Sequence, residues 1–206
     1  MRRRTEIQLL AILILSFIPC FAHAQAEADV RRSGPFFLTV QLAGGQGVVA
    51  VGGGYWLADR RLEPEVLVGY VPRSIGGSRM AVFTFKTTYT PFEPKLGGRG
   101  DWRLNPVSVG GFLNYTTGKQ FFLTNDSAGR YPKGYYWWSS AVRLGAFAGL
   151  RLTHHSTEPN LHGWPRRTSF YSELSTNDLH LVSALTNKTL RIPEILTLGL
   201  GVKNGW

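Results

Sequence analysis

A histidine and a serine two residues apart are the side chains in this sequence best suited to nucleophilic chemistry. His154 and Ser156 stand in the stretch "LTHHST", with His155 between them. On a β-strand, residues i and i+2 point to the same face, so the imidazole of His154 would lie beside the hydroxyl of Ser156. A neighbouring imidazole can take the proton of a serine hydroxyl and activate it as a nucleophile. The spacing suits an esterase, and it also suits a polar strand end without chemistry.

A second set of residues places charge on stretches that are otherwise apolar or rich in glycine. Buried charges must be paired to be tolerated. We therefore expect an interior charge network made by Lys86, Arg143, Arg151, Glu65 and Glu173. In a small barrel such a network fills the interior. The alternative is a narrow pore whose positive lining selects anions.

Two further arginines suggest a contact with lipid, whereas the remaining residues give no sign of a metal or cofactor site. Arg166 and Arg167 follow the loop-like stretch "LHGWP", where they are expected to reach lipid phosphates at a membrane interface. His180 has no second ligand at a spacing typical of metal sites, and the glycine clusters match no phosphate-binding loop. The sequence therefore predicts no metal and no other cofactor.

Long stretches of period-two alternation must position these residues. In residues 142–153 leucine, valine and alanine occupy the even positions, while arginine, glycine, phenylalanine and threonine occupy the odd ones. The same period recurs in residues 81–89, 107–115 and 196–203. Successive side chains of a strand point to opposite faces, so each stretch predicts a strand with one apolar face. Strands of about ten residues exceed the five or six that are usual in soluble sandwiches.

The alternation and the turn residues together predict eight strands. Their ranges are 36–44, 47–57, 64–72, 79–91, 106–117, 139–154, 167–186 and 191–204. Eight antiparallel strands can close into a barrel whose own side chains fill the interior. An alternative division splits residues 167–186 into two strands that turn at Asn177 and Asp178.

The distribution of charge over the two faces predicts a transmembrane barrel. The aliphatic faces carry hardly any charge, while Lys86, Arg143, Arg151 and Lys203 lie on the faces with small residues. A barrel with apolar residues outside and polar residues inside is typical of an outer membrane. Aromatic residues 55–56 and 135–138, and the final residue of the chain, are expected to form belts at the lipid interfaces.

The beginning of the chain predicts export. Three arginines at positions 2–4, an apolar run at 9–18 and "AHA" at 22–24 are typical of a signal peptide cleaved near Ala24, leaving a barrel domain of residues 25–206. The single cysteine, Cys20, would leave with it. Removing the three arginines and Glu6 lowers the formal charge from +10 to about +8. For an exported chain this charge suits lipid phosphates better than nucleic acid.

These features together resemble the small outer-membrane β-barrel proteins of Gram-negative bacteria. The last segment, "ILTLGLGVKNGW", is similar to the C-terminal strands that the outer-membrane assembly machinery recognises. The His-x-Ser pair also resembles that of the outer-membrane lipid A deacylase. That resemblance implies His154 as general base, Ser156 as nucleophile, and Glu173 or Glu158 as the group that orients the base. It departs from the deacylase pattern at Thr157, where an asparagine would follow the serine.

The sequence leaves three functions open. The first is a non-enzymatic envelope protein with a filled barrel, which contacts outer-membrane lipid or lipopolysaccharide. The second is a lipid A-modifying esterase, and the third is a narrow anion-leaning pore. If the C-terminus is periplasmic, an eight-strand count places His154 at the periplasmic end of its strand, away from the lipid A leaflet. Splitting residues 167–186 into two strands would reverse that placement.

Overall fold

The computed structural model describes residues 35–97, 101–118, 121, 123, 139–159, 165–186 and 192–205. The expected signal peptide at residues 1–24 lies outside these ranges. So do the aromatic residues 135–138 and the final tryptophan, so their expected place at a lipid interface stays a prediction.

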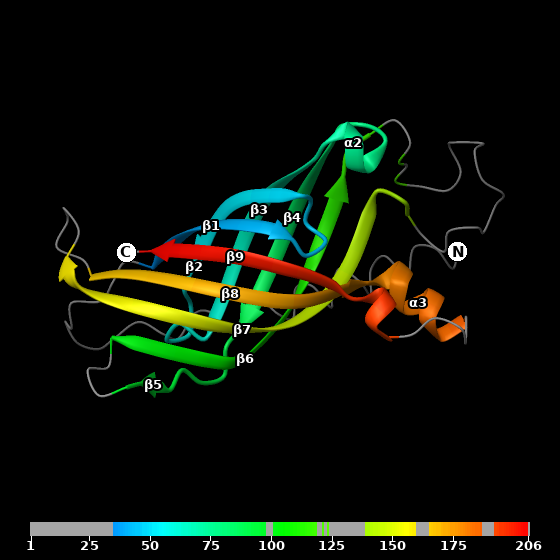
Figure 1. The fold of residues 1–206 in the computed structure, drawn as a ribbon. Coiled ribbons are helices and arrows are strands. Elements are labelled where there is room, and N and C mark those ends of the chain that lie inside the picture. The colour runs from blue at the N-terminus through cyan, green and yellow to red at the C-terminus, as the bar shows by residue number, and fades with distance from the viewer. Residues whose placement is uncertain are drawn as a thin grey trace, which may run out of the picture. The chain divides into compact units, whose positions relative to one another are not determined.

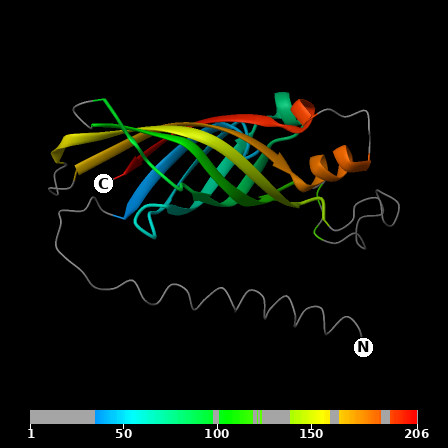
Figure 2. The same ribbon diagram turned by 90° about the horizontal axis from the view of Figure 1, so that it is seen from below.

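Eight long strands close into an antiparallel barrel (Figure 1). They are β1 (Phe36–Ala43), β2 (Val49–Tyr55), β3 (Leu62–Val71), β4 (Met80–Tyr89), β6 (Trp102–Thr116), β7 (Val142–Pro159), β8 (Pro165–Asn177) and β9 (Thr197–Gly205). Each strand pairs with the next along the chain, and β9 pairs with β1 to close the ring. The short β5 (Lys95–Leu96) pairs only with the start of β6. Figure 2 shows the tilted strands of opposite walls crossing one another. The predicted eight-stranded antiparallel barrel is thereby confirmed.

The two ends of the barrel differ in their connections. At one end β1 begins and β9 ends. At the same end residues 56–61 link β2 to β3, and residues 90–101 link β4 to β6. We call this end the C-terminal mouth. At the other end, the opposite mouth, residues 44–48, 72–79, 117–141 and 178–196 link the strands. This end carries α2 (Arg73–Gly76), α3 (Asp178–Thr186) and the 3-10 turn η2 (Ile192–Ile195).

The predicted strand at residues 167–186 is wrong in its second half. β8 ends at Asn177, whose side-chain oxygen accepts a hydrogen bond from the backbone N–H of His180 at 2.9 Å. Asparagine caps helices in this way, so the chain enters α3 rather than continuing as a strand. Leucines at 179 and 181 give the same pattern as a strand, because a short apolar run fits the repeat of a helix as well as that of a strand. The helix also excludes a second strand after Asn177, so the count stays at eight.

β6 begins four residues earlier than the predicted start at residue 106. The pairing of β6 with β7 shifts register between Asn105 and Ser108, and Pro106 stands inside this bulge. Proline is tolerated in a strand at a bulge, where no ladder hydrogen bond is required of it. The bulge interrupts the alternation, which is why the pattern does not reveal residues 102–105 as strand.

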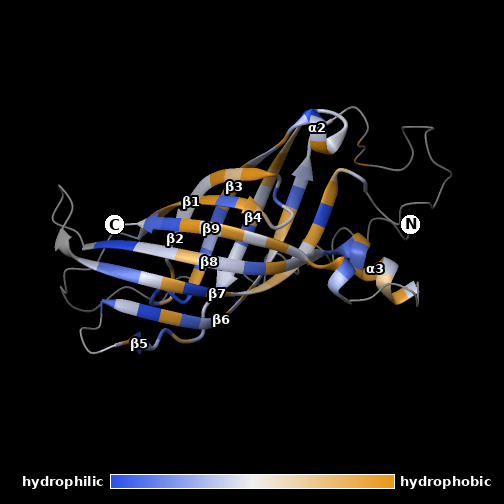
Figure 3. Ribbon diagram, viewed as in Figure 1, coloured by the Kyte–Doolittle hydropathy of each residue, from blue (hydrophilic) through white to orange (hydrophobic). Residues whose placement is uncertain are grey.

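Burial is inverted relative to a soluble protein. The inward positions hold buried threonine, serine, glutamine, glutamate, lysine and arginine, whereas large apolar side chains of all eight long strands, aliphatic or aromatic, lie exposed outside. Val66 is 56% exposed and Leu200 is 50% exposed, while Lys86 and Glu63 are fully buried. Figure 3 shows the resulting alternation of hydrophilic and hydrophobic bands along the strands. No helix in the described part of the chain is long and apolar enough to cross a membrane.

Aromatic rings fill the interior by lying over inward-facing glycines. The pairs are Phe112 over Gly145, Phe147 over Gly110, Tyr171 over Gly201 and Trp56 over Gly205. A Cβ built on any of these glycines would meet ring carbons at 2.0–2.5 Å, closer than atoms can approach. Glycine on the inner face is therefore required by packing, because a ring on an adjoining wall occupies its side-chain space.

We expect Gly145→Ala to lower the free energy of unfolding by about 1–3 kcal/mol, since the added methyl group would overlap the ring of Phe112. The matched control is Gly111→Ala on the facing strand, where a Cβ finds only a carbonyl oxygen at 3.4 Å. Denaturant unfolding of the refolded protein in detergent measures both variants. Equal stability of the two would contradict the ring-over-glycine packing.

Candidate functional site

Six charged side chains from five strands meet inside the barrel. They are Glu63 and Glu65 on β3, Lys86 on β4, Arg151 on β7, Glu173 on β8 and Lys203 on β9. Each is at most 3% exposed. We call this set the charge chain, because acidic and basic groups alternate along it. Three carboxylates face three cations, so the buried charge is balanced.

The first half of the charge chain is centred on Glu63. Its carboxylate accepts hydrogen bonds from both terminal nitrogens of Arg151, from Lys203 Nζ at 2.9 Å and from Trp56 Nε1 at 3.2 Å. A bidentate pair of a guanidinium and a carboxylate is among the strongest and most directional contacts between side chains. Glu63 therefore ties together β3, β7, β9 and the start of the β2–β3 connection across the interior.

The second half of the charge chain runs from Lys203 to Glu173. Lys203 Nζ donates to Glu65 at 2.9 Å, Glu65 lies 3.8 Å from Lys86 Nζ, and Lys86 donates to Glu173 at 2.6 Å. Thr39 donates a further hydrogen bond to Glu65 at 2.8 Å. Every carboxylate thus has a cation and at least one hydrogen bond, as burial requires.

Gln41 and Tyr171 complete the polar interior. The Gln41 amide nitrogen donates to Glu173 at 2.7 Å, and its oxygen accepts from Lys86 and from the Tyr171 hydroxyl, each at 2.9 Å. The ammonium of Lys86 lies 4.5 Å from the centre of the Phe147 ring, a favourable cation–π contact. Rings and paired charges therefore occupy the space that a pore would need.

The structure brings Lys86, Arg151, Glu65 and Glu173 into the charge chain and leaves Arg143 out of it. Arg143 lies near the opposite mouth and pairs with Asp178 of α3 at 3.5 Å. Its placement differs from the predicted one because it stands at the end of β7, where α3 folds against the mouth. The alternation of the sequence does not predict this helix.

Glu63 and Lys203 are members of the charge chain that the predicted network lacks. The predicted third strand begins at residue 64, which leaves Glu63 in a turn. The spacing Glu-Pro-Glu was the available signal, since residues 63 and 65 share one face of any strand that contains both. Lys203 does stand on the predicted inner face, but its partners come from β3, which is distant in sequence.

His154 and Glu173 lie on opposite faces of the barrel wall. His154 pairs in register with Trp102, and their ring centres are 4.7 Å apart on the outer side, where Trp102 is 39% exposed. Glu173 points inward and binds Lys86 and Gln41. The structure therefore does not bring the implied orienting carboxylate to the imidazole. Ser156 lies just past the last regular β7–β8 pair, and the side chain of Glu158 is outside the described residues.

Arg166 and Arg167 point to different sides of β8. Arg166 is exposed, as a contact with lipid phosphate would require. Arg167 is buried inside the C-terminal mouth, where it pairs with Glu93 at 2.6 Å. The prediction that both arginines contact lipid phosphate does not allow for the alternation of side chains along a strand. Once β8 begins at Pro165, two consecutive arginines point to opposite faces.

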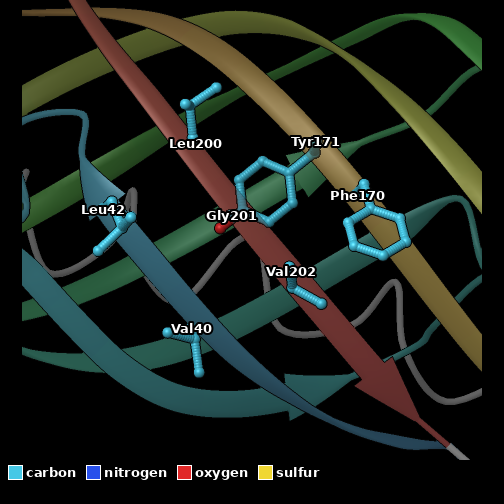
Figure 4. Close-up of a pocket in the computed structure, with 7 residues that line it drawn as sticks. All are labelled: Val40, Leu42, Phe170, Tyr171, Leu200, Gly201 and Val202. Atoms are coloured by element: carbon cyan, nitrogen blue, oxygen red, sulfur yellow. The ribbon is translucent and has the colours of Figure 1, made fainter.

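An apolar groove of about 350 Å³ lies over the strands where the barrel closes (Figure 4). Its lining comes from β1, β8 and β9, namely Val40, Leu42, Phe170, Tyr171, Leu200, Gly201 and Val202. The side chain of Tyr171 turns inward over Gly201, and its hydroxyl donates to Gln41 inside the barrel. The groove therefore offers dispersion contacts and no polar recognition.

Among the described residues, no group of three or more histidine, cysteine, aspartate or glutamate side chains is arranged to hold a metal ion. Comparison of the chain with protein-family models, with curated proteins and with solved structures finds no match.

Replacing Glu63 by glutamine tests the charge chain. Glu63→Gln leaves Arg151 and Lys203 buried with one carboxylate fewer, so we expect a loss of about 3–5 kcal/mol in the free energy of unfolding. Arg143→Gln is the control, because it removes one ion pair at the opposite mouth and leaves the charge chain intact, so we expect a smaller loss. Similar losses in the two variants would show that the charge chain is not what holds the barrel.

Because Glu173 is separated from His154, we expect Ser156→Ala to leave lipid A acylation unchanged. Mass spectrometry of lipid A from cells expressing each form provides the measurement, with membrane location of both forms checked in parallel. Loss of an acyl chain that depends on Ser156 would restore the esterase interpretation.

Proposed function

We propose that this chain is a non-enzymatic outer-membrane protein whose barrel spans the bilayer and whose interior is closed by paired charges. Its role in the envelope is structural or binding, carried by the mouths and the outer surface. The inverted burial is the observation that supports this proposal most strongly: ionised groups are buried inside and aliphatic groups are exposed all around. Water does not stabilise so large an apolar surface, whereas lipid does.

The outer surface has the layered composition that a bilayer favours. Between the mouths the exposed positions are mainly leucine, valine and phenylalanine. Exposed Tyr55, Tyr89 and Trp102 lie towards the C-terminal mouth, and exposed Tyr70 and Tyr115 lie towards the opposite mouth. Tyrosine and tryptophan favour the headgroup level because one part of the ring is apolar and the other binds water.

The lengths of the connections favour one orientation. Turns are short on the periplasmic side of outer-membrane barrels and longer on the outside. The C-terminal mouth has connections at residues 56–61 and 90–101, whereas the opposite mouth has the longer connections, at residues 117–141 and 178–196. We therefore place the C-terminal mouth in the periplasm and the opposite mouth next to lipopolysaccharide. In this orientation His154 is on the side away from lipid A, which disfavours the esterase.

The interior favours a closed barrel over a pore. The charge chain crosses the lumen from β3 to β7 and β8, and rings lie over the glycines between these strands. An ion would have to separate buried pairs in order to pass, and breaking one such pair costs several kcal/mol. β9, which closes the ring against β1, is the segment we expect the outer-membrane assembly machinery to read.

Placing a charge on the outer surface tests the proposal. In a bilayer, Val66→Arg sets a guanidinium against lipid and should lower stability by about 2–4 kcal/mol. In a soluble barrel the same exposed position would change stability by about 0.5 kcal/mol or less. Ile75→Arg is the control, since Ile75 is exposed on α2 beyond the strands.

The measurement is reversible denaturant unfolding from lipid vesicles, with sedimentation of cell membranes to locate both variants. The membrane assignment would be overturned if the wild-type protein remained in the soluble periplasmic fraction. It would also be overturned if Val66→Arg left the free energy of unfolding unchanged.

A further inference from the structure

We propose that the C-terminal mouth is a binding site for a phosphate group, built on Arg103 and Arg167. This inference goes beyond the proposed function and requires only the closed barrel. The ligand chemistry is that of a small phosphorylated anion, either free or as the headgroup of a lipid.

Two guanidinium groups share a single carboxylate at this mouth. Glu93, in the connection after β4, lies 2.6 Å from a terminal nitrogen of Arg167 and 3.8 Å from one of Arg103. The charge chain deeper in the barrel matches three cations with three carboxylates, whereas this cluster carries one cation more than it has acids. A second anion would restore the balance.

The indole of Trp56 forms the platform of the site. The guanidinium carbon of Arg167 lies 5.3 Å from the centre of this ring, and that of Arg60 lies 5.9 Å from it. The ring rests over Gly205, which leaves room for it at the end of β9. Stacking on an aromatic ring holds a guanidinium flat, so that its edge can receive an oxyanion.

Buried N–H groups without acceptors mark where the anion would bind. Arg167 is only 2% exposed, yet its Nε and one terminal nitrogen have no hydrogen-bond partner. Arg103 Nε and His155 Nε2 are also buried without a partner. His155 faces Arg167 across the β7–β8 pair and lies within the electrostatic reach of Arg103 and Arg60. Leaving the guanidinium N–H groups unpaired is costly, and phosphate oxygens can accept from them. His155 Nε2 can donate in the same way in the tautomer that carries its proton there.

The site is open on the side of Arg103. The side chain of Arg103 is 34% exposed and that of Glu93 is 18% exposed, whereas Arg167 forms the floor. A phosphate can therefore approach past Arg103 and compete with Glu93 for Arg167. Glu93 acts as an internal competitor, which makes its removal informative.

Calorimetric titration of pyrophosphate into the full chain, folded in detergent micelles at low salt, tests the inference. We expect Arg103→Gln to weaken binding at least tenfold, because it removes the accessible guanidinium. Arg143→Gln, which removes an arginine near the opposite mouth, should bind as the wild type does. Glu93→Gln should bind several-fold more tightly, since the competing carboxylate is gone. A purely structural Glu93 would not produce that gain.

Two lipids in the same micelles separate the sources of phosphate. If the wild-type protein binds lysophosphatidic acid more tightly than lysophosphatidylcholine, and Arg103→Gln loses this preference, the phosphate is that of a lipid headgroup. If the protein binds pyrophosphate but prefers neither lipid, the ligand is a free anion. The inference is overturned if folded wild-type protein binds neither probe. It is also overturned if Arg103→Gln and Arg143→Gln bind equally, which would indicate a general attraction to positive charge.

Discussion

The pairing of charges inside the barrel is the constraint on which the rest of this structure depends. Glu63 and Glu65 point into the lumen from neighbouring inward positions of β3, and they are tolerated there only because Arg151, Lys203 and Lys86 reach them from other strands. An unpaired ion in that space would cost several kcal/mol. The pairs therefore select one arrangement of β3, β4, β7 and β9, because a shift of one residue in any of these strands would turn its charges outward.

The paired interior also explains the composition of both faces. With the charges paired inside, the outer positions are free to be apolar, and the glycines inside make room for rings that lie across them. The ring of Tyr171 covers Gly201 and carries its hydroxyl to Gln41, so one residue both fills space and joins the polar network. Ring packing and charge pairing thus fill the interior together, as the proposed structural or binding role requires.

The two mouths are built differently. At the opposite mouth Arg143 has its own acidic partner in Asp178, and a helix folds against the strand ends. At the C-terminal mouth Arg103 and Arg167 share Glu93, while Trp56 supports the second guanidinium. Two guanidinium groups therefore share one carboxylate at the mouth that we assign to the periplasm.

The sequence by itself determined the class of fold, because period-two alternation states which residues share a face. It therefore predicted eight strands, an apolar exterior, and inward Lys86, Arg151 and Glu173. It did not reveal that residues 178–186 leave the sheet, since a short apolar run fits helix and strand alike and the cap at Asn177 decides between them. Only the tertiary structure decided which charges meet. Glu63 finds Lys203 across 140 positions of sequence, His154 and Glu173 fall on opposite faces, and Arg167 turns inward to Glu93, because barrel closure and strand register bring together residues that no local pattern connects.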